Sequence, residues 1–366
     1  MIKAVIIGTS HMHVNEVALY ITECVDMELI GVSDVPSDVD KIPPLRYTPE
    51  WNLQNVIDNY CPVYYNDYKK MLDELKPDVA FILTENCQKP EVVNECAIRK
   101  VNVCIEKPVA VSLDEAKKIK KSVDENGIEA YVNWPVAWRP YLYKFKAALD
   151  SGVVGKPVKL RYINGHTGPL GIGAKHRGVS ENAEEMTNEQ RSKTWWHKES
   201  HGGGVYLDIC CYGCYFSRWL LGNGAKSIIS AGANLNTPFG DTFDNFGAIV
   251  KYDDKMAVLE GTWTTPRVVI PSGPMIICTE GVIECTGGAE NMPDVKAYDI
   301  YGNEIEIPDV NVGYNMKNLP CHYADHIKNG SDIMEMLTLD VNMDVMAILD
   351  SAIKSSMSSK EEKINF

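Results

Sequence analysis

Short apolar runs alternate with amphipathic segments through the first 134 residues of the chain. Runs typical of buried strands cover residues 2–8, 27–34, 78–84, 101–107 and 128–134. Helical spacing covers residues 14–24, 68–77 and 91–100, and a further helix begins at Ser112, which stands three residues before Glu115 as in a capping box. Repeated βα units of this kind require a parallel sheet with right-handed crossovers, so the sequence predicts an α/β fold.

The pattern changes after residue 134. An amphipathic helix is expected at 139–152, a strand at 153–164, a long polar segment at 165–201 and a glycine-led helix within 202–222. Strand-like runs with turn signals follow between 226 and 302, and a last helix is expected near 339–357. The second part should therefore be an α+β domain with a large, mostly antiparallel sheet, one face covered by the two helices and the other available to a second subunit.

Composition and charge narrow the classes of partner. The 366 residues exceed the size at which one core keeps growing, so two domains are expected, divided as 1–134 and 135–366, with the last helix able to pack back on the first domain. A net charge of −14 argues against nucleic acid and anionic membranes. Eleven cysteines without a repeating frame, and no signal peptide, indicate free thiols in the cytoplasm.

No metal site is expected. Cys210, Cys211 and Cys214 form the only close cysteine cluster and have no matching second pair, so we interpret them as buried thiols on a helix. His322 and His326 have helical spacing that could suit a metal, but no HExxH pattern surrounds them, and we interpret them as ordinary helix residues.

The turn after the first apolar run decides whether the sheet holds a dinucleotide. The usual fingerprint is GxGxxG, whereas this chain has GTSHMH, comprising Gly8, Thr9, Ser10, His11, Met12 and His13. Gly8 still allows the tight turn, and Ser10 can cap the helix and donate to a phosphate. Asp34 ends the second strand, where it can accept from a ribose diol and repel a 2′-phosphate, which favours NAD over NADP. His11 and His13 are either contacts to cofactor or substrate, or simply packed or solvent-facing histidines.

The ends of the later strands carry further candidate chemistry. The run VNVCIEKPVA stops at Glu106, Lys107 and Pro108, and ligands of open α/β sheets bind at such strand ends. Thr84 and Asn86, after the fourth strand, should line the cofactor, and Asn133, after the last, is a candidate contact to nicotinamide or substrate. Taken alone, the EKP tripeptide favours a charged loop after a strand, and only its combination with the other motifs points to chemistry.

The middle of the chain supplies candidate substrate contacts. The polar segment contains His176 and Trp195, and exposed tryptophans beside hydrogen-bonding groups suit the face of a sugar ring, with interface packing as the alternative. Asp208 and Tyr212 stand four apart on one helix face, where a carboxylate beside a phenol is uncommon in a helix that merely packs. The alternative is a core aromatic and a capping or paired carboxylate.

Taken together, these motifs resemble the glucose-fructose oxidoreductase, inositol dehydrogenase and MocA family. The resemblance rests on the first turn, EKPVA, VNWPVAWRP, SGVVGKPV and GGGVYLDICCYGCYFSRWLLG, in that order over nearly the whole chain. It implies an N-terminal Rossmann domain and a C-terminal domain that commonly mediates oligomers, with Lys107, Asp208 and Tyr212 converging on the nicotinamide and the substrate carbon.

The resemblance has two departures and one narrower form. Many members have histidine at the position of Tyr212, and tyrosine there is similar to the glucose-fructose oxidoreductase and dihydrodiol dehydrogenase branches. The GTSHMH turn departs from the glycine pattern. Together with the tryptophan- and histidine-rich middle segment, that turn resembles enzymes of gut bacteria that oxidise the C3 hydroxyl of glycosides.

The resulting hypothesis is an NAD-dependent oxidoreductase acting on a sugar, cyclitol or glycoside hydroxyl. Tyr212 would take the hydroxyl proton, Lys107 would favour the phenolate and the developing alkoxide, and Asp208 would orient the lysine or the sugar. Trp138 and Arg139 join His176 and Trp195 as expected substrate contacts, and a homo-oligomer is expected. The alternatives are a glycosidase that retains NAD and works by transient oxidation, and a non-catalytic sensor of dinucleotide or sugar.

Overall fold

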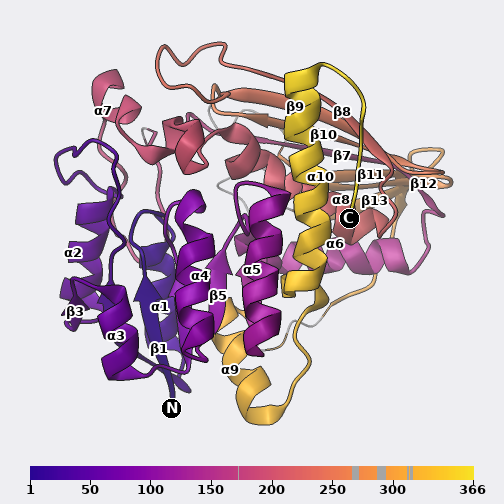
Figure 1. Cartoon of the computed structure of the whole chain (residues 1–366). Coiled ribbons are helices and arrows are strands. Elements are labelled where there is room, and N and C mark those ends of the chain that lie inside the picture. The colour runs from indigo at the N-terminus through magenta and orange to yellow at the C-terminus, as the bar shows by residue number, and fades with distance from the viewer. Residues whose placement is uncertain (172, 266–271, 287–293, 311–312, 314–315) are drawn as a thin grey trace. The chain divides into compact units, whose positions relative to one another are not determined.

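The structure is a computed structural model that describes the whole chain except residues 172, 266–271, 287–293, 311–312 and 314–315. The chain forms two compact units that are interleaved along the sequence. The first unit contains Met1–Trp134, Leu170–Gly203 and Tyr314–Asn342, and the second contains Pro135–Pro169, Gly204–Gly313 and Met343–Phe366. Each unit is described separately below, with the elements labelled in Figure 1.

The first unit is built on a six-stranded parallel sheet in the order β3-β2-β1-β4-β5-β6. This is the doubly wound order, with its switch point between β1 and β4, and it confirms the predicted parallel sheet. The strands are β1 (Ile2–Ile7), β2 (Met27–Ser33), β3 (Tyr64–Tyr65), β4 (Val79–Ile82), β5 (Asn102–Glu106) and β6 (Ala130–Asn133).

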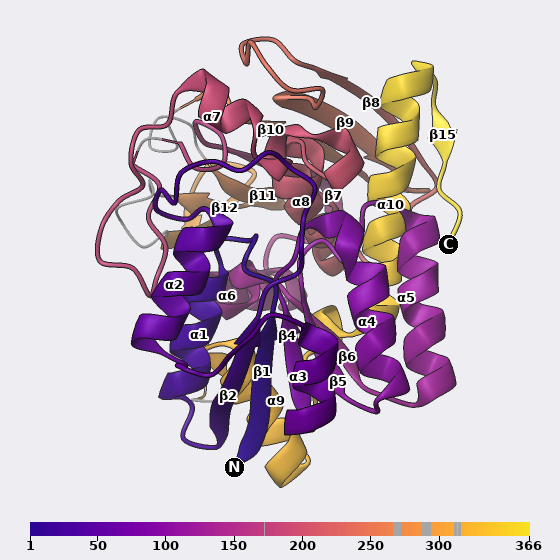
Figure 2. The same ribbon diagram turned by 60° about the vertical axis from the view of Figure 1, so that its left-hand side comes forward.

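Helices cover this sheet because every crossover must return over a face. They are α1 (Val14–Glu23), α2 (Pro49–Asn59), α3 (Tyr68–Leu75), α4 (Lys89–Ile98) and α5 (Leu113–Asn126). Figures 1 and 2 show α4 and α5 side by side, where Ser122 on α5 donates to Asn94 on α4. Ser112 caps α5 as expected, since its side chain accepts from the backbone N–H of Glu115.

Two later segments complete the first unit. The segment 170–203 carries the short helix α7 (Asn188–Ser192), and 314–342 carries α9 (Leu319–Asn329). Tyr47 donates its hydroxyl to the carbonyl of Glu181, and the indole N–H of Trp134 donates to Asn342 over 2.7 Å. Both tryptophan and asparagine are buried, so the later segments are part of the core of this unit.

The second unit contains a nine-stranded sheet in the order β14-β13-β12-β11-β7-β10-β9-β8-β15. The pair β7 and β10 is parallel, whereas the other strand pairs of the described residues are antiparallel, so the prediction of a mostly antiparallel sheet is confirmed. The strands are β7 (Pro157–Gly165), β8 (Ser227–Ala233), β9 (Asn245–Lys251), β10 (Met256–Thr262), β11 (Gly273–Cys278), β12 (Gly281–Thr286), β13 (Asp294–Asp299), β14 (Glu304–Ile305) and β15 (Glu362–Lys363).

One face of this sheet is a continuous apolar core. A row of directly paired residues crosses seven strands with no exposed surface, and it consists of Ile228, Val250, Ala257, Leu160, Ile276, Ile283 and Ala297. Helix α6 (Pro140–Asp150) packs on β12 and β13, and α8 (Cys211–Leu221) packs on β7 and β10. The last helix is α10 (Leu339–Ser358). Its Ser355 Oγ accepts a hydrogen bond from the backbone N–H of Ser230 on β8.

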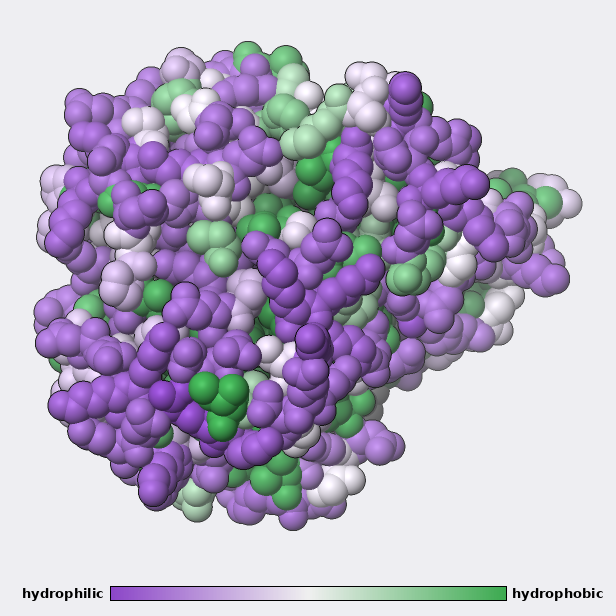
Figure 3. All heavy atoms as spheres, viewed as in Figure 1, coloured by the Kyte–Doolittle hydropathy of each residue, from purple (hydrophilic) through white to green (hydrophobic). Residues whose placement is uncertain are grey.

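The remaining surface is mixed. On the opposite face of the large sheet Ile229 and Ile277 are exposed, near an ion pair between Arg161 and Glu260. The molecular face drawn in Figure 3 is largely hydrophilic, with apolar side chains scattered among charged ones. None of the described helices is long and apolar enough to cross a membrane.

Candidate active site and cofactor pocket

The turn between β1 and α1 depends on Gly8. Its φ is +90°, and a Cβ there would lie 2.5–2.7 Å from side-chain and backbone atoms of Thr84. The following residue, Thr9, donates its backbone N–H to Asp34 Oδ1 over 2.8 Å, and the Thr9 carbonyl accepts from Asn52. The turn after β1 is therefore fixed by β2, by β4 and by the second helix.

The side chain of His11 forms a hydrogen bond within the dinucleotide turn. Its Nδ1 accepts the backbone N–H of His13 over 3.2 Å, and its ring meets Trp196 edge-on at 5.0 Å. Burial is the largest cause that lowers the pKa of His11 well below its ordinary value, followed by the positive fields of His13 and Lys107. His11 is therefore a neutral imidazole that orders the turn.

The turn retains donors for an anion. Within the described part of the chain, the backbone N–H groups of Ser10 and Met12 have no intramolecular partner. They stand at the N-terminal end of α1, where free N–H groups and the helix dipole favour a phosphate.

A pocket of about 290 Å³ opens beside this turn, entirely within the first unit. Its walls combine Ser10 and Asp34 with the loop after β2, and with Thr194, Trp195 and Trp196 from the later segment. Burial raises the pKa of Asp34, although the N–H of Thr9 opposes that rise.

The two tryptophans are buried, contrary to the expectation that they are exposed. Trp195 and Trp196 are 2% and 4% exposed, and their rings stack with centroids 3.8 Å apart. The indole N–H of Trp195 donates to the carbonyl of Ser10 over 3.1 Å. Packing against the first turn removes their apolar surface from water, so they line the pocket rather than offering an open platform.

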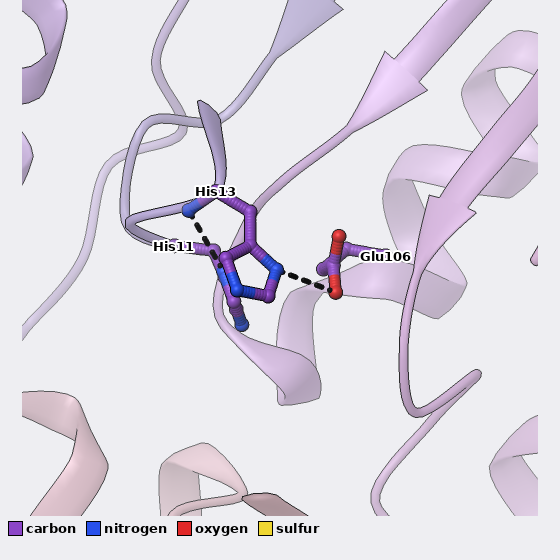
Figure 4. A group of neighbouring side chains, drawn as sticks. All are labelled: His11, His13 and Glu106. Carbon is purple, nitrogen blue, oxygen red and sulfur yellow. Dashed lines mark hydrogen bonds and ion pairs between the residues drawn. The ribbon is translucent and has the colours of Figure 1, made fainter. Parts of the chain in front are cut away.

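Glu106 joins two polar side chains at the carboxyl ends of the strands, and Figure 4 shows its contact with His13. Glu106, at the end of β5, places Oε1 3.1 Å from Nδ1 of His13, and its Oε2 accepts from the amide of Asn133, the last residue of β6. Burial raises the pKa of Glu106, but His13, Lys107 and Lys89 outweigh burial and lower it below its usual range. Glu106 is therefore an ionised carboxylate inside the unit.

The ammonium group of Lys89 binds the backbone at the carboxyl end of β5. It is fully buried, and its ammonium donates to Asn86 Oδ1 over 2.7 Å and to the carbonyls of Glu106 and Pro108 over 2.7 and 2.6 Å. Asn86 in turn donates its amide to the carbonyl of Gly202 over 2.8 Å. The predicted cofactor residues Asn86 and Glu106 are thus joined through one lysine that the sequence analysis did not single out.

The ring of His176 lies beside that of His13. Their ring centroids are 5.3 Å apart, and His176 also meets Tyr47 edge-on at 5.3 Å. The backbone N–H of His176 donates to the Tyr47 hydroxyl. The structure thereby brings the rings of His11, His13 and His176 together in the first unit.

The second unit contributes Asp208 and Tyr212. Asp208 lies in a π-helical turn (Tyr206–Cys210) that precedes α8, a feature frequent at functional sites. Its Oδ2 accepts from the indole of Trp263 over 3.0 Å and lies 3.2 Å from Nε2 of His166. Tyr212 follows one turn later and is 8% exposed. Lys107 belongs to the first unit, and its convergence with Asp208 and Tyr212 stays a prediction.

Two further expected substrate contacts lie at the start of α6 in the second unit. Trp138 is half-buried, and Arg139 is exposed at the N-cap position of that helix. Their contact with a substrate stays a prediction.

Among the described residues, His11, His13 and Glu106 form the group with metal-compatible spacing, since their candidate ligand atoms lie within 4.8 Å of one another. We do not assign them as ligands. The ammonium groups of Lys89 and Lys107 act on the same carboxylate and oppose a divalent cation there. The expectation that no metal is bound stays a prediction.

Comparison with known sequences agrees with this geometry. Residues 2–134 match the oxidoreductase family with an NAD-binding Rossmann fold, and residues 143–284 match the GFO/IDH/MocA C-terminal domain. The chain belongs to the GFO/IDH/MocA family. The resemblance inferred from the motifs is thereby confirmed, as are its NAD-binding domain and its oxidoreductase class.

Similar proteins of the GFO/IDH/MocA family are distant in sequence. Scyllo-inositol 2-dehydrogenase (NAD(+)) of Bacillus subtilis is 23% identical over 301 residues, which is 80% of each chain. The WlbA dehydrogenase of Bordetella pertussis, solved with NADH and UDP-GlcNAcA, is 18% identical with a TM-score of 0.76 over 100% of this chain and 98% of that chain. An oxidoreductase of Agrobacterium radiobacter, solved with NAD+, L-tartaric acid and magnesium, is 17% identical with a TM-score of 0.74 over 99% and 98%.

The observed residues suit the cofactor of the GFO/IDH/MocA family. The free N–H groups of Ser10 and Met12 can hold a pyrophosphate, and Asp34 stands where a ribose diol would be received. Sequence reasoning missed Lys89, named Trp196 and His166 only as members of the polar segment, and left the role of His13 open. A buried lysine carries no periodic signal, whereas His13 had one available signal, because it occupies the third glycine position of the dinucleotide turn.

Proposed function

We propose that this chain transfers a hydride between NAD and a secondary hydroxyl of a sugar, cyclitol or glycoside. The observation that carries the proposal is the arrangement at the carboxyl ends of the first unit's strands. The dinucleotide turn follows β1 and Asp34 follows β2, whereas Glu106, Lys107 and Asn133 lie at the ends of β5 and β6.

Cofactor binding follows from the donors and acceptors present. Ser10 and Met12 hold the pyrophosphate through their backbone N–H groups, and Asp34 accepts from the ribose diol and disfavours a 2′-phosphate by charge. Thr84, Asn86 and Asn133 line the nicotinamide half. When bound, NAD supplies the acceptor for the hydride that leaves the substrate carbon.

The substrate must lose a hydroxyl proton as the hydride departs, so the chain needs a proton acceptor, a stabiliser of negative charge and contacts to a polyol. Lys107 stabilises the developing alkoxide, and Asp208 and Tyr212 orient the hydroxyls. The GFO/IDH/MocA relative named above for scyllo-inositol supports a polyol. Oxidation at C3 of a glucoside is the narrower form of this proposal.

The test combines a substrate panel with a cofactor switch. The purified protein is mixed with NAD or NADP and with inositols, aldoses and glycosides, and reduced nicotinamide is followed by absorbance. Asp34→Ser should reduce the preference for NAD over NADP by roughly 10- to 100-fold, since a group worth one to three kcal/mol is removed. Asp38→Ser, at an exposed aspartate four residues later, is the matched control.

The outcomes are distinct. Accumulating NADH supports the dehydrogenase, whereas release of aglycone without NADH supports a glycosidase that regenerates its cofactor. Reduction of neither nucleotide by any member of the panel contradicts the proposal.

We also propose a homo-oligomer formed through the large sheet. The exposed apolar residues Ile229 and Ile277 on its second face support this proposal. Light scattering of the eluted protein measures the mass, and a monomer at micromolar concentration would contradict it.

A further inference from the structure

We propose that His13, held by Glu106, accepts the hydroxyl proton during substrate oxidation; this inference rests on the proposed function and names its base. The proposal starts from two contacts in the first unit, both made by Glu106. Glu106 joins His13 on one oxygen and Asn133 on the other, so the carboxyl ends of β5 and β6 are linked to the dinucleotide turn.

The contact with Glu106 sets the tautomer of His13. An ionised carboxylate only accepts hydrogen bonds, so Nδ1 of His13 carries the proton and donates across 3.1 Å. In the neutral ring, Nε2 then keeps a free lone pair and can accept a proton. This is the arrangement in which a carboxylate orients an imidazole for base catalysis.

His11 has the opposite arrangement. Its Nδ1 accepts from the backbone of His13, so its own proton lies on Nε2 in the neutral form. His11 is buried, whereas the side chain of His13 is 12% exposed and that of Glu106 is fully buried. Of these three side chains, His13 alone combines a basic nitrogen with access to a ligand.

The charges around His13 come from several elements. Glu106 and Lys107 follow β5, Lys89 begins α4, His11 lies in the same turn and His176 lies in the later segment. The carboxylate favours the imidazolium that forms on proton transfer, while the two ammonium groups oppose it. His13 lies beside the carboxyl ends of β5 and β6, where the proposed function places the nicotinamide and the reacting hydroxyl.

The proton and electron balance is complete with NAD as the oxidant. The O–H bond of the substrate breaks and its proton goes to Nε2 of His13; the C–H bond breaks and its electron pair leaves with hydrogen as the hydride. The carbonyl forms between the same carbon and oxygen. The imidazolium then releases its proton to water before the next turnover.

Histidine is better matched to this step than tyrosine. An ordinary phenol has a pKa of about 10 and an ordinary imidazole about 6.5, so only the latter is largely basic at neutral pH.

The first measurement does not depend on activity. Long-range proton–nitrogen NMR of the wild-type protein reports which ring nitrogen of His13 carries hydrogen, with His13→Gln supplying the assignment. We expect protonated Nδ1 and unprotonated Nε2 near neutral pH, and loss of that pattern in Glu106→Gln. A neutral ring protonated on Nε2 would overturn the proposal, whether or not any variant folds well.

The second measurement compares His13→Gln with a matched control. His326→Gln removes another imidazole beside a glutamate, 3.4 Å from Glu129, but that pair lies at the amino end of β6. We expect kcat of His13→Gln to fall by roughly 10²- to 10⁴-fold, as for loss of a general base, while the Kd for NAD changes less than about threefold. His326→Gln should keep kcat.

Rescue separates a catalytic role from a structural one. In His13→Ala, added imidazole should restore part of kcat, whereas a loss of kcat through misfolding should not be restored. If wild type oxidises a substrate and His13→Gln keeps its kcat within a few-fold, the inference fails while the proposed function stands. If wild type binds NAD but oxidises nothing, the proposed function itself fails.

One further outcome would also overturn the inference. Stoichiometric manganese, iron or zinc in the purified protein, lost in His13→Gln and needed for activity, would make His13 a metal ligand rather than a base.

Discussion

The buried ammonium of Lys89 gives the sharpest stability prediction. Lys89→Met keeps the length of the side chain but removes a donor to Asn86, Glu106 and Pro108. Each hydrogen bond from a charged donor is worth about 1.5–3 kcal/mol, and part of the sum is offset because no ammonium must be buried. We expect a net loss of about 3–5 kcal/mol, which is typical of removing one partner from a buried charge network.

The assay is urea and thermal unfolding followed by tryptophan fluorescence and far-ultraviolet circular dichroism. At about 2–4 °C per kcal/mol, the transition of the first unit should move down by roughly 10 °C. Lys70→Met is the matched control, because Lys70 is exposed and its ammonium forms an ion pair with Glu74 at 3.7 Å on the surface, so its loss should cost under about 0.5 kcal/mol. A change below about 1 kcal/mol for Lys89→Met would refute the view that this lysine holds the strand end together.

Two other substitutions test the turn after β1. His11→Asn keeps an acceptor for the N–H of His13 but removes a group whose pKa is lowered by burial. Below about pH 6.5 only the unfolded state of the wild type protonates His11, so the wild type should lose up to about 1.4 kcal/mol of unfolding free energy per pH unit relative to the variant. Equal pH slopes of the two proteins in urea titrations would contradict this. Gly8→Ala should cost at least about 3 kcal/mol of stability and weaken NAD binding, because its Cβ would overlap Thr84. The control Gly127→Ala also has a positive φ, but its Cβ would meet open space, so it should cost about 1 kcal/mol. Similar losses for the two variants in calorimetry would show that the overlap at Gly8 relaxes.

The parallel sheet could be predicted from the sequence because parallel strands are buried on both faces and read as apolar runs. The strand order was not predicted, because it depends on tertiary packing. Helix α2 could not be predicted, since its buried residues are Asn52 and Val56 and a buried asparagine interrupts the apolar stripe. Asn52 is buried because it bonds the carbonyls of Thr9 and Tyr47, which is a tertiary fact.

The candidate site divides in the same way. Gly8, Asp34 and Glu106 stand at strand ends and follow from topology, whereas the pairing of His13 with Glu106 spans 93 residues and depends on β1, β4 and β5 lying side by side. For the two tryptophans the sequence left exposure and packing open, and the structure shows packing; an apolar ring beside polar residues gives no sign of what packs against it.

The interleaving of the first unit has a consequence for the order in which the chain can fold during its synthesis. Trp134 needs Asn342, and the turn at Ser10 needs Trp195, so the first six strands leave the ribosome long before their last partners exist. Domains that are continuous in sequence can finish folding while the rest is being translated. Here the core of the earliest sheet stays incomplete until residue 342 has been made.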